Sequence, residues 1–254
     1  MVALSNHNKF TPDNLSKLRI INNVAPIETL RTFQNKVPQA SQVSAYGLTE
    51  VGGVTSFGSP DDPLEHRLTT CGKPWPEVEI RILDPETNQV LSNEEKGLIE
   101  IRGPHVFSGY LNDNEATKNA LSDDGWFSTG DVGSLTNDGY IRYHGRIKDM
   151  LKVGGENVAA LEIEAYFDSH EKVLISQVIG IEDDHLGEVP AVFIEKKPGV
   201  KISKDELVDF CKGQISNFKI PRYIVFVNEW PMSSTKVQKF KLKDLDLGDK
   251  VFGN

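Results

Sequence analysis

The stretch that decides the fold reads GRIKDMLKVGGEN, residues 145–157. It carries three cationic residues and a pair of glycines, and a helical pattern begins at its last residue, Asn157. A pair of glycines lets a narrow ligand pass close to the backbone. The alternative is a solvated basic linker, which the interspersed apolar residues disfavour. We therefore predict a domain boundary between Gly145 and Gly154.

Upstream of this boundary the sequence pattern changes twice, from helical spacing to a short strand and then to a series of short strands. Residues 13–36 have a helical pattern with a break at 22–26, and residues 41–45 are typical of a short strand. From about residue 65 to 145, short strand patterns alternate with Gly and Pro, which favours a small β-barrel or sandwich. The strands expected in that part are Glu77–Leu83, Gly97–Arg102 and Tyr140–Tyr143.

Downstream of the boundary, helical and strand patterns alternate in a way that is typical of a small α+β domain of about 100 residues. Apolar residues recur at helical spacing in two segments and form short apolar runs in three others. The expected helices are Asn157–Ser169 and Lys204–Ile215, and the expected strands are Val173–Ile181, Val189–Glu195 and Tyr223–Val227.

The composition is that of a globular protein and excludes collagen-like, coiled-coil and wholly disordered chains. The 254 residues are 38% hydrophobic and 26% charged, and the net charge is −9. An acidic chain has no general attraction for nucleic acid or anionic lipid, so we expect no nucleic-acid partner and expect local donors to hold any phosphate. No apolar run approaches the ~20 residues needed to span a bilayer.

The cysteines and histidines give no sign of a disulfide framework or a transition-metal site. Cys71 and Cys211 lie far apart, and the six histidines form no paired motif. The opening, Met1–Phe10, is polar where a signal peptide would be apolar. We therefore expect a reducing, cytoplasmic location.

Tyr46-Gly47-Leu48-Thr49-Glu50 places a hydroxyl and a carboxylate directly after an expected strand. The carboxyl edge of an open α/β sheet is where such folds bind ligands. Thr49 could donate to a phosphate oxygen, and Glu50 could hold Mg²⁺ beside it. The alternative is an ordinary turn with Glu50 in solvent.

Gly125-Trp126-Phe127-Ser128-Thr129-Gly130-Asp131 ends in a carboxylate that follows a glycine. Such an Asp can accept hydrogen bonds from both hydroxyls of a ribose. The alternative is a plain β-turn, because Ser, Thr, Gly and Asp all favour turns.

The polar segment 231–241 presents Lys236 near the end of the chain. A lysine on a mobile loop can reach a developing negative charge, whereas most exposed lysines near a terminus have no such role.

These four segments occur together in this order, with Gly72-Lys73-Pro74, residues 97–104 and Gly109-Tyr110 between them. The combination resembles the C-terminal half of the adenylate-forming superfamily, which includes acyl-CoA synthetases, luciferases and adenylation domains of peptide synthetases. The resemblance extends from about Leu15 to Leu242. It implies the end of a large α/β N-terminal domain with a small β-barrel subdomain (1–147), then a small mobile α+β domain (148–254).

The resemblance implies a role for each matching residue of the first part. Tyr46, with Gly47 beside it, matches the residue that lines the adenine and acyl pocket. Thr49 matches the contact to the AMP phosphate, and Glu50 the residue associated with Mg²⁺. Asp131 matches the acceptor of the ribose hydroxyls.

The same holds for the second part and its boundary. Arg146 matches a second ribose contact, and Lys148 occupies the hinge position. Gly154 and Gly155 match the thiol-tunnel segment of the second half-reaction. Lys236 matches the lysine that bridges the carboxylate and the α-phosphate during adenylation.

The implied activity is an ATP-dependent, AMP-forming acid–thiol ligation with ATP/AMP, Mg²⁺ and coenzyme A. A carboxylic acid, such as a fatty acid, becomes an acyl-adenylate and then an acyl-CoA thioester. A preorganised cation where the two anions meet is worth about 10²–10³ in rate, which suits Lys236. A hinge at Lys148 would swing the small domain between the two half-reactions.

The family's phosphate loop, rich in Ser, Thr and Gly, does not occur in this sequence. We therefore expect a fragment, either an expressed piece or the product of a split gene. It would need the missing N-terminal half in cis or trans and would have little activity alone. The alternatives are a carrier-protein phosphopantetheine as acceptor, luciferase-like oxidative chemistry, a non-catalytic nucleotide- or acyl-adenylate-binding module, and an interaction fragment that works beside a partner chain.

Overall fold

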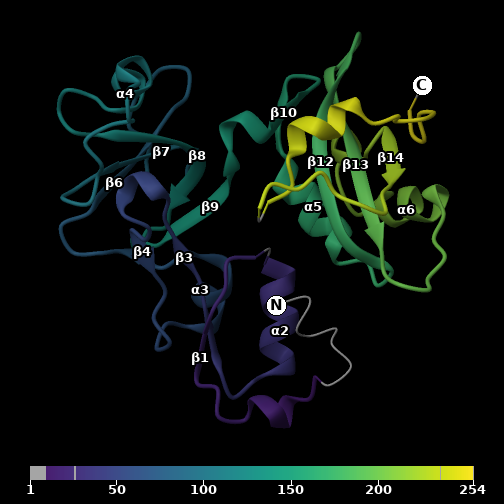
Figure 1. Cartoon of the computed structure of the whole chain (residues 1–254), viewed down its shortest axis with the longest axis horizontal. Helices are drawn as coiled ribbons and strands as arrows, with labels where there is room; N and C mark the ends of the chain where they lie inside the picture. The colour runs from purple at the N-terminus through teal and green to yellow at the C-terminus, as the bar shows by residue number, and fades with distance from the viewer. Residues whose placement is uncertain (1–9, 26, 235, 254) are drawn as a thin grey trace. The chain divides into compact units, whose positions relative to one another are not determined.

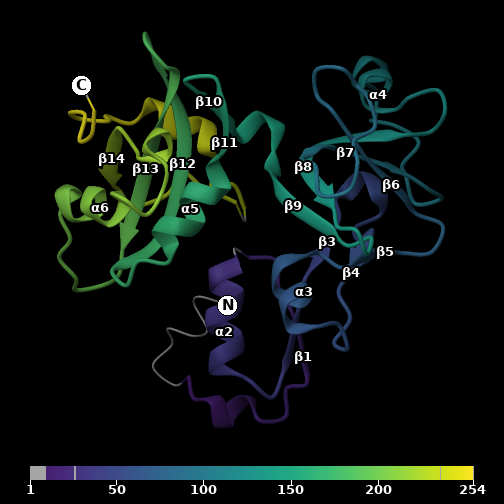
Figure 2. The same cartoon turned by 180° about the vertical axis from the view of Figure 1, so that it is seen from behind.

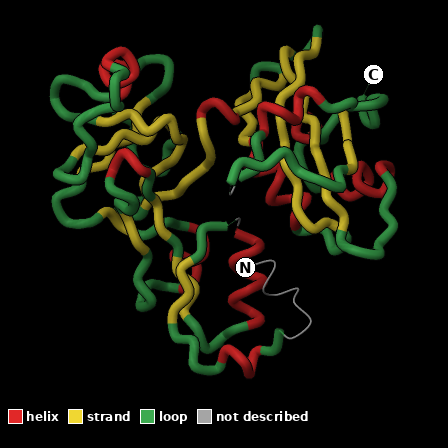
Figure 3. Tube along the Cα trace, viewed as in Figure 1, coloured by secondary structure: helices red, strands yellow, loops and turns green. Residues whose placement is uncertain are grey.

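The computed structural model describes residues 10–25, 27–234 and 236–253. It contains two compact units, Met1–Ile147 and Lys148–Asn254, whose elements Figures 1 and 2 label from opposite sides. The first unit combines helices with three sheets and the second combines helices with one five-stranded sheet, as the α/β and α+β prediction requires. Apart from β8 (Phe127–Leu135), the strands of the first unit are short, whereas two long strands dominate the second (Figure 3). The hinge between the units stays a prediction.

The first unit begins with a β-α-β element. Strand β1 (Ile20–Asn22) pairs in parallel with β2 (Ser41–Val43), and helix α2 (Ile27–Lys36) connects them. The helix buries Phe33 in a small apolar cluster. The prediction of helix before the break was wrong at Ile20 and Ile21, because pairing with β2 outweighs the helical spacing of these apolar residues. Only the 3-10 turn η1 (Pro12–Leu15) is helical there.

A small three-stranded sheet follows and carries the first site residue. Its order is β3-β4-β5, all antiparallel, and Tyr46 ends strand β3. Its elements and their helical neighbours are β3 (Ala45–Tyr46), η2 (Thr49–Val51), β4 (Ser56–Phe57), α3 (Leu64–Thr69) and β5 (Lys73–Pro74).

The rest of the first unit is an antiparallel meander of four strands in the order β6-β7-β8-β9. Alternate residues of β7 are buried, and Ile99 and Ile101 pack against Phe127 and Ile141 in the core of this part. The sheet is open within the described residues, so the barrel expected here does not close. The elements are β6 (Glu79–Leu83), β7 (Gly97–Arg102), α4 (Asn114–Ala120), β8 (Phe127–Leu135) and β9 (Ile141–Arg146).

The second unit is a mixed sheet in the order β11-β10-β13-β12, with β14 parallel to β13. Its strands are β10 (Met150–Val153), β11 (Glu156–Ala159), β12 (Val173–Asp183), β13 (Gly187–Lys196) and β14 (Tyr223–Phe226). Its helices and 3-10 turns are η3 (Ile147–Asp149), α5 (Ala160–Asp168), α6 (Lys204–Cys211), η4 (Asn217–Lys219) and η5 (Lys239–Asp244).

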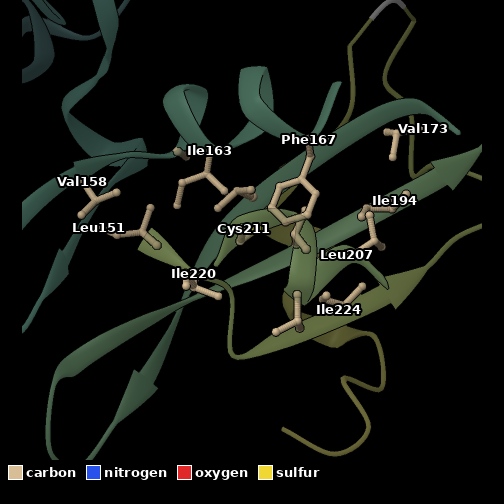
Figure 4. Packing of buried hydrophobic residues seen from close by; sticks show 14 of the residues in the cluster. Leu151, Val158, Ile163, Phe167, Val173, Ile194, Leu207, Cys211, Ile220 and Ile224 are labelled. Carbon is tan, nitrogen blue, oxygen red and sulfur yellow. The ribbon is translucent and has the colours of Figure 1, made fainter. Parts of the chain in front are cut away.

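Both faces of this sheet are covered. Val192 and Ile194 of β13 face the main core, where Phe167 of α5 and Leu207 of α6 pack (Figure 4). The alternate residues of β13 face a second apolar cluster that contains Leu242 of η5. Strand β13 is therefore buried continuously from residue 189 to 194, as a central strand covered on both faces should be.

Two helix boundaries differ from the sequence-based ones. Helix α5 begins at Ala160, since Glu156–Ala159 pairs with β10 as a strand. Helix α6 ends at Cys211, where the following residue leaves helical dihedrals. In the part of the chain that the structure describes, no helix is long and apolar enough to cross a membrane.

Candidate active site

Three of the residues singled out by motif meet in the first unit at a buried carboxylate. Asp131 of β8 lies directly opposite Arg146 of β9 in the strand register. The Arg146 Nε donates to Asp131 Oδ1 at 3.0 Å, and the Tyr46 hydroxyl donates to Asp131 Oδ2 at 2.7 Å. Tyr46 and Asp131 are each only 6% exposed. The structure thus brings residues 46, 131 and 146 together, although they are far apart in sequence.

The backbone around Asp131 is held in place by Thr129. The Asp131 amide donates to Thr129 Oγ1 at 3.0 Å, and that hydroxyl donates to the Ile99 carbonyl of the neighbouring strand at 2.8 Å. Between them, Gly130 has a φ of 69°, which an L side chain rarely adopts. Residues 127–135 form a strand and not the β-turn that was the alternative, so Asp131 projects from a paired sheet.

Burial and the neighbouring groups shift the pKa of this carboxylate in opposite directions. Burial raises the pKa of Asp131 above its usual value, while the hydrogen bond from Tyr46 and the Arg146 guanidinium lower it. Burial, followed by the negative charge of Asp131, raises the pKa of Tyr46 well above its usual value. Tyr46 is therefore a neutral donor, and it leaves Asp131 oxygen lone pairs to accept further hydrogen bonds. The Arg146 side chain is 45% exposed, whereas that of Asp131 is only 9% exposed.

Gly47 is required by a close backbone approach after strand β3. A Cβ at this position would lie 1.9 Å from the Gly53 carbonyl oxygen. This is a backbone atom, so the clash could not be relieved by the movement of a flexible side chain. The Thr55 amide donates to the Tyr46 carbonyl at 2.9 Å and closes the same loop. Within this loop Thr49 opens the 3-10 turn η2 and is exposed.

Glu50 is partly exposed, and within the described residues its carboxylate has one hydrogen-bond partner. The Tyr110 hydroxyl donates to Glu50 Oε1 at 3.0 Å, and burial followed by the Glu50 carboxylate raises the pKa of Tyr110. Among the described residues, no group of three or more His, Cys, Asp or Glu could hold a metal by itself. Mg²⁺ commonly uses one or two carboxylates and completes its shell with water and substrate phosphates. A site at Glu50 fits that mode.

Two aromatic residues of this region were not predicted as site residues. Tyr143 stacks on Tyr46 with ring centroids 5.9 Å apart, and Tyr110 binds Glu50. Tyr110 stands in the Gly109-Tyr110 pair of the resemblance, so its motif was visible, but nothing in the sequence connects it to a residue 60 positions away. Tyr143 carried no signal beyond its place in an expected strand.

The remaining site candidates belong to the second unit or its start. Lys148 lies in the turn η3 and is the first residue of the second unit. Gly154 and Gly155 are the two loop residues of the hairpin β10–β11, and their φ angles of 60° and 89° are those of a type I′ turn. The geometry of this turn by itself explains why two glycines stand here. A contact between these glycines and a thiol stays a prediction.

Lys236 is exposed on the loop that follows residue 230. Its amide donates to Ser233 Oγ at 3.1 Å, and its carbonyl accepts from the Ser233 amide at 2.8 Å. Lys236 and Asp131 are in different units, so the approach of this lysine to a nucleotide at Asp131 stays a prediction.

The chain is similar to known AMP-binding proteins in both units. Residues 1–111 match the AMP-binding enzyme family model, and residues 162–237 match the model of the AMP-binding enzyme C-terminal domain. YngI of Bacillus subtilis (strain 168), whose name describes an acyl-CoA synthetase, is 38% identical over 247 residues, which are 96% of this chain and 45% of YngI. The human mitochondrial medium-chain acyl-CoA ligase ACSF2 is 40% identical over 87% of this chain and 36% of ACSF2.

Solved structures are similar to this chain as well. ATP-bound MatB from Rhodopseudomonas palustris has a TM-score of 0.83 at 32% identity and covers 94% of this chain, which spans 48% of MatB. The Bacillus subtilis o-succinylbenzoate CoA synthetase MenE, in complex with the acyl-adenylate OSB-AMP, has a TM-score of 0.79 at 31% identity, covering 91% of this chain and 46% of MenE. The chain thus spans less than half the length of these proteins. ACSF2 is named as mitochondrial, so the cytoplasmic location of this chain stays a prediction.

Proposed function

Because the chain belongs to the adenylate-forming, AMP-binding enzymes of the acyl-CoA synthetase type, we propose that it carries the ribose-binding and lysine-bearing parts of an AMP-forming acid–thiol ligase. The observation that carries this proposal is the Asp131 carboxylate, which accepts hydrogen bonds from the buried Tyr46 and from the half-exposed Arg146 side chain. Two ribose hydroxyls can donate to the two oxygens of such a carboxylate.

In the first half-reaction an oxygen of the substrate carboxylate attacks the α-phosphorus of ATP, and pyrophosphate leaves. The two reacting groups are both anionic, so a cation at their meeting point lowers the barrier, and one such group is worth about 10²–10³ in rate. We assign this role to Lys236 and the phosphate contact to Thr49. Glu50 would hold Mg²⁺, which neutralises phosphate oxygens when bound.

In the second half-reaction the thiol of coenzyme A attacks the acyl carbonyl, and AMP leaves. Gly154 and Gly155 would border the path of the pantetheine arm, because their turn carries no side chains. Lys148 would be the hinge that exchanges Lys236 for this turn at the nucleotide. The acid is first sought among medium-chain fatty acids, since ACSF2 is named for such substrates.

Calorimetry on the 254-residue chain tests the nucleotide site. We expect AMP and a non-hydrolysable acyl-AMP analogue to bind, and Asp131→Asn to weaken both by about 10- to 100-fold, because one charge-assisted acceptor is worth about 1.5–3 kcal/mol. Glu79→Gln, an exposed carboxylate of the same unit paired with Arg102, is the matched control and should leave the affinity unchanged. Equal affinity for Asp131→Asn and the unsubstituted chain would reject the assignment.

Turnover is tested in a chimera in which this chain replaces the matching segment of YngI. Lys236→Ala should lower acyl-adenylate formation by about 10²–10³ and leave thioester formation from added acyl-adenylate within about threefold. Equal losses in both half-reactions would contradict the role of Lys236. Thioester formation with a carrier protein but not with free coenzyme A would identify phosphopantetheine as acceptor, and binding without turnover would identify a nucleotide-binding module.

A further inference from the structure

The two arms of the loop that carries Lys236 are joined by hydrogen bonds of the backbone and of the Ser233 hydroxyl. Besides the three bonds between Ser233 and Lys236, two of which use the Ser233 hydroxyl, the Gln238 amide donates to the Pro231 carbonyl at 2.7 Å. These bonds join residues 231–234 to residues 236–238. The Lys236 backbone is therefore held in place while its side chain remains exposed.

The downstream end of this loop is tied to the second unit by an ion pair. Lys239 Nζ lies 2.5 Å from Glu164 Oε1, and Glu164, on helix α5, is only 5% exposed. The same oxygen accepts the Val178 amide of β12 at 2.8 Å. Among the described strands β12 pairs only with β13, so this amide lies on the free edge of the sheet. Lys239, three residues after Lys236, is thereby fixed to that edge.

A neighbouring carboxylate of α5 binds the same edge and makes the attachment rigid. Asp168 Oδ1 accepts the Ser176 amide at 2.7 Å and the Ser176 hydroxyl at 2.8 Å. Ser176 and Val178 are two residues apart, so their amides point to the same side of β12. Glu164 is therefore part of a fixed seam between helix and strand, and not a carboxylate that could follow a moving lysine.

The upstream end of the loop has its own anchor. The Trp230 Nε1 donates to Glu195 Oε2 of β13 at 2.6 Å. Trp230 and Val237 both pack against the apolar cluster that contains the fully buried Leu242. The loop is thus held at both ends on the same unit, and the tip with Lys236 lies between the two anchors.

We propose that Glu164 and Lys239 are positioning residues that hold the Lys236 loop in one conformation, so that the Lys236 ammonium needs no reorganisation when it meets its anionic partner. This inference rests on the adenylation role proposed for Lys236. A buried ion pair adds little stability compared with apolar side chains of the same volume, so stability alone does not explain this one. A role in positioning Lys236 explains the pair, since a displacement of about 1 Å in an active site can cost about 10²-fold in rate.

Hydrogen exchange on the 254-residue chain measures the loop without any need for turnover. We expect the amides at 233, 236 and 238 to exchange about tenfold faster in Lys239→Met than in the unsubstituted chain. Lys219→Met is the matched control, because Lys219 pairs with Glu162 on the same helix but lies in the turn η4. It should leave these amides unchanged, and Lys239→Arg should restore their protection.

Equal protection of the loop amides in Lys239→Met and Lys219→Met would overturn the proposal. So would acceleration of all amides of the second unit to the same extent, which would indicate global destabilisation. If Lys239→Met does not fold, Trp230→Phe tests the upstream anchor, since it keeps an aromatic side chain at this position but removes the five-membered part of the indole and with it the N–H donor to Glu195. It should loosen the same amides.

The kinetic effect is read in the YngI chimera. Lys239→Met should lower kcat for adenylate formation by about 10²-fold with the KM for ATP within about threefold, because the variant misplaces Lys236 and removes no nucleotide contact. A loosened loop with unchanged kcat would refute the positioning role while leaving the adenylation proposal intact. A chimera without any turnover would refute the adenylation proposal, and the exchange data would still decide whether the pair orders the loop.

Discussion

The hydroxyl of Tyr46 offers the sharpest test of the carboxylate site. Replacing Tyr46 by Phe keeps the buried ring and its stacking on Tyr143 and removes only the donor 2.7 Å from Asp131 Oδ2. A hydrogen bond to a charged acceptor is worth about 1.5–3 kcal/mol. Since Tyr46 and Asp131 are both buried, water cannot fully replace the lost donor. We expect Tyr46→Phe to lower the free energy of unfolding at pH 7 by about that amount.

The same change has a predictable pH dependence. Burial already raises the pKa of Asp131 from 3.8, so the folded protein binds this proton more tightly than the unfolded chain. The contribution of such a group to stability is fully present below its unfolded pKa and is lost as the pH rises through the folded pKa. Because the Tyr46 hydrogen bond lowers the pKa of Asp131, the folded pKa should rise further without this hydroxyl. The stability loss in Tyr46→Phe should therefore be small below pH 4 and grow toward pH 7.

Urea unfolding of the chain at a series of pH values measures this difference, and a ¹³C NMR titration of the Asp131 carboxyl reports its pKa directly. Tyr140→Phe is the matched control, because the Tyr140 hydroxyl donates to the partly exposed Asp62 at the same 2.7 Å. Its loss should be smaller, about 0–1 kcal/mol, since water can replace that donor. A Tyr46→Phe loss that is independent of pH, or no larger than that of Tyr140→Phe, would refute the electrostatic account of the site.

Two further predictions concern the backbone. Gly47→Ala should destabilise the first unit by at least about 3 kcal/mol, because its Cβ would lie 1.9 Å from the Gly53 carbonyl. Gly139→Ala, which has a positive φ but no atom within 4 Å of the added Cβ, should cost only about 1–2 kcal/mol. Equal unfolding temperatures of the two variants would contradict this prediction. Limited proteolysis should cut at 146–149 before either flank, since the turn η3 has no buried residue and Leu151 beyond it is only 2% exposed; first cleavage inside β12 or β8 would argue against a hinge at Lys148.

Much of the architecture could be predicted from local patterns. The strand at Gly97–Arg102 has the predicted bounds, and the strands that begin at Val173 and Tyr223 start where their apolar runs start. The pattern failed where pairing with a distant segment decides the conformation. Ile20–Asn22 is a strand because Ser41–Val43 lies beside it, and the open meander in place of a barrel depends on which strand edges meet.

The site residues show the same division. The motifs selected Tyr46, Asp131 and Arg146 one by one, but no spacing predicts that a tyrosine hydroxyl 85 residues upstream binds the carboxylate. Tyr110 and Tyr143 were missed for this reason, because their roles depend on contacts and not on local sequence. The Glu164–Lys239 pair, 75 residues apart, gave no signal at all.

What the sequence determined by itself is what local chemistry controls: the alternation of buried and exposed residues in strands, the glycines at turns of positive φ, and the ordered motifs that carry the family resemblance. Only the tertiary structure decided which side chains share an environment. Burial, charge and hydrogen bonding at Asp131 come from three strands that meet in space, and a pKa or a fixed donor depends on distance through space and not along the chain.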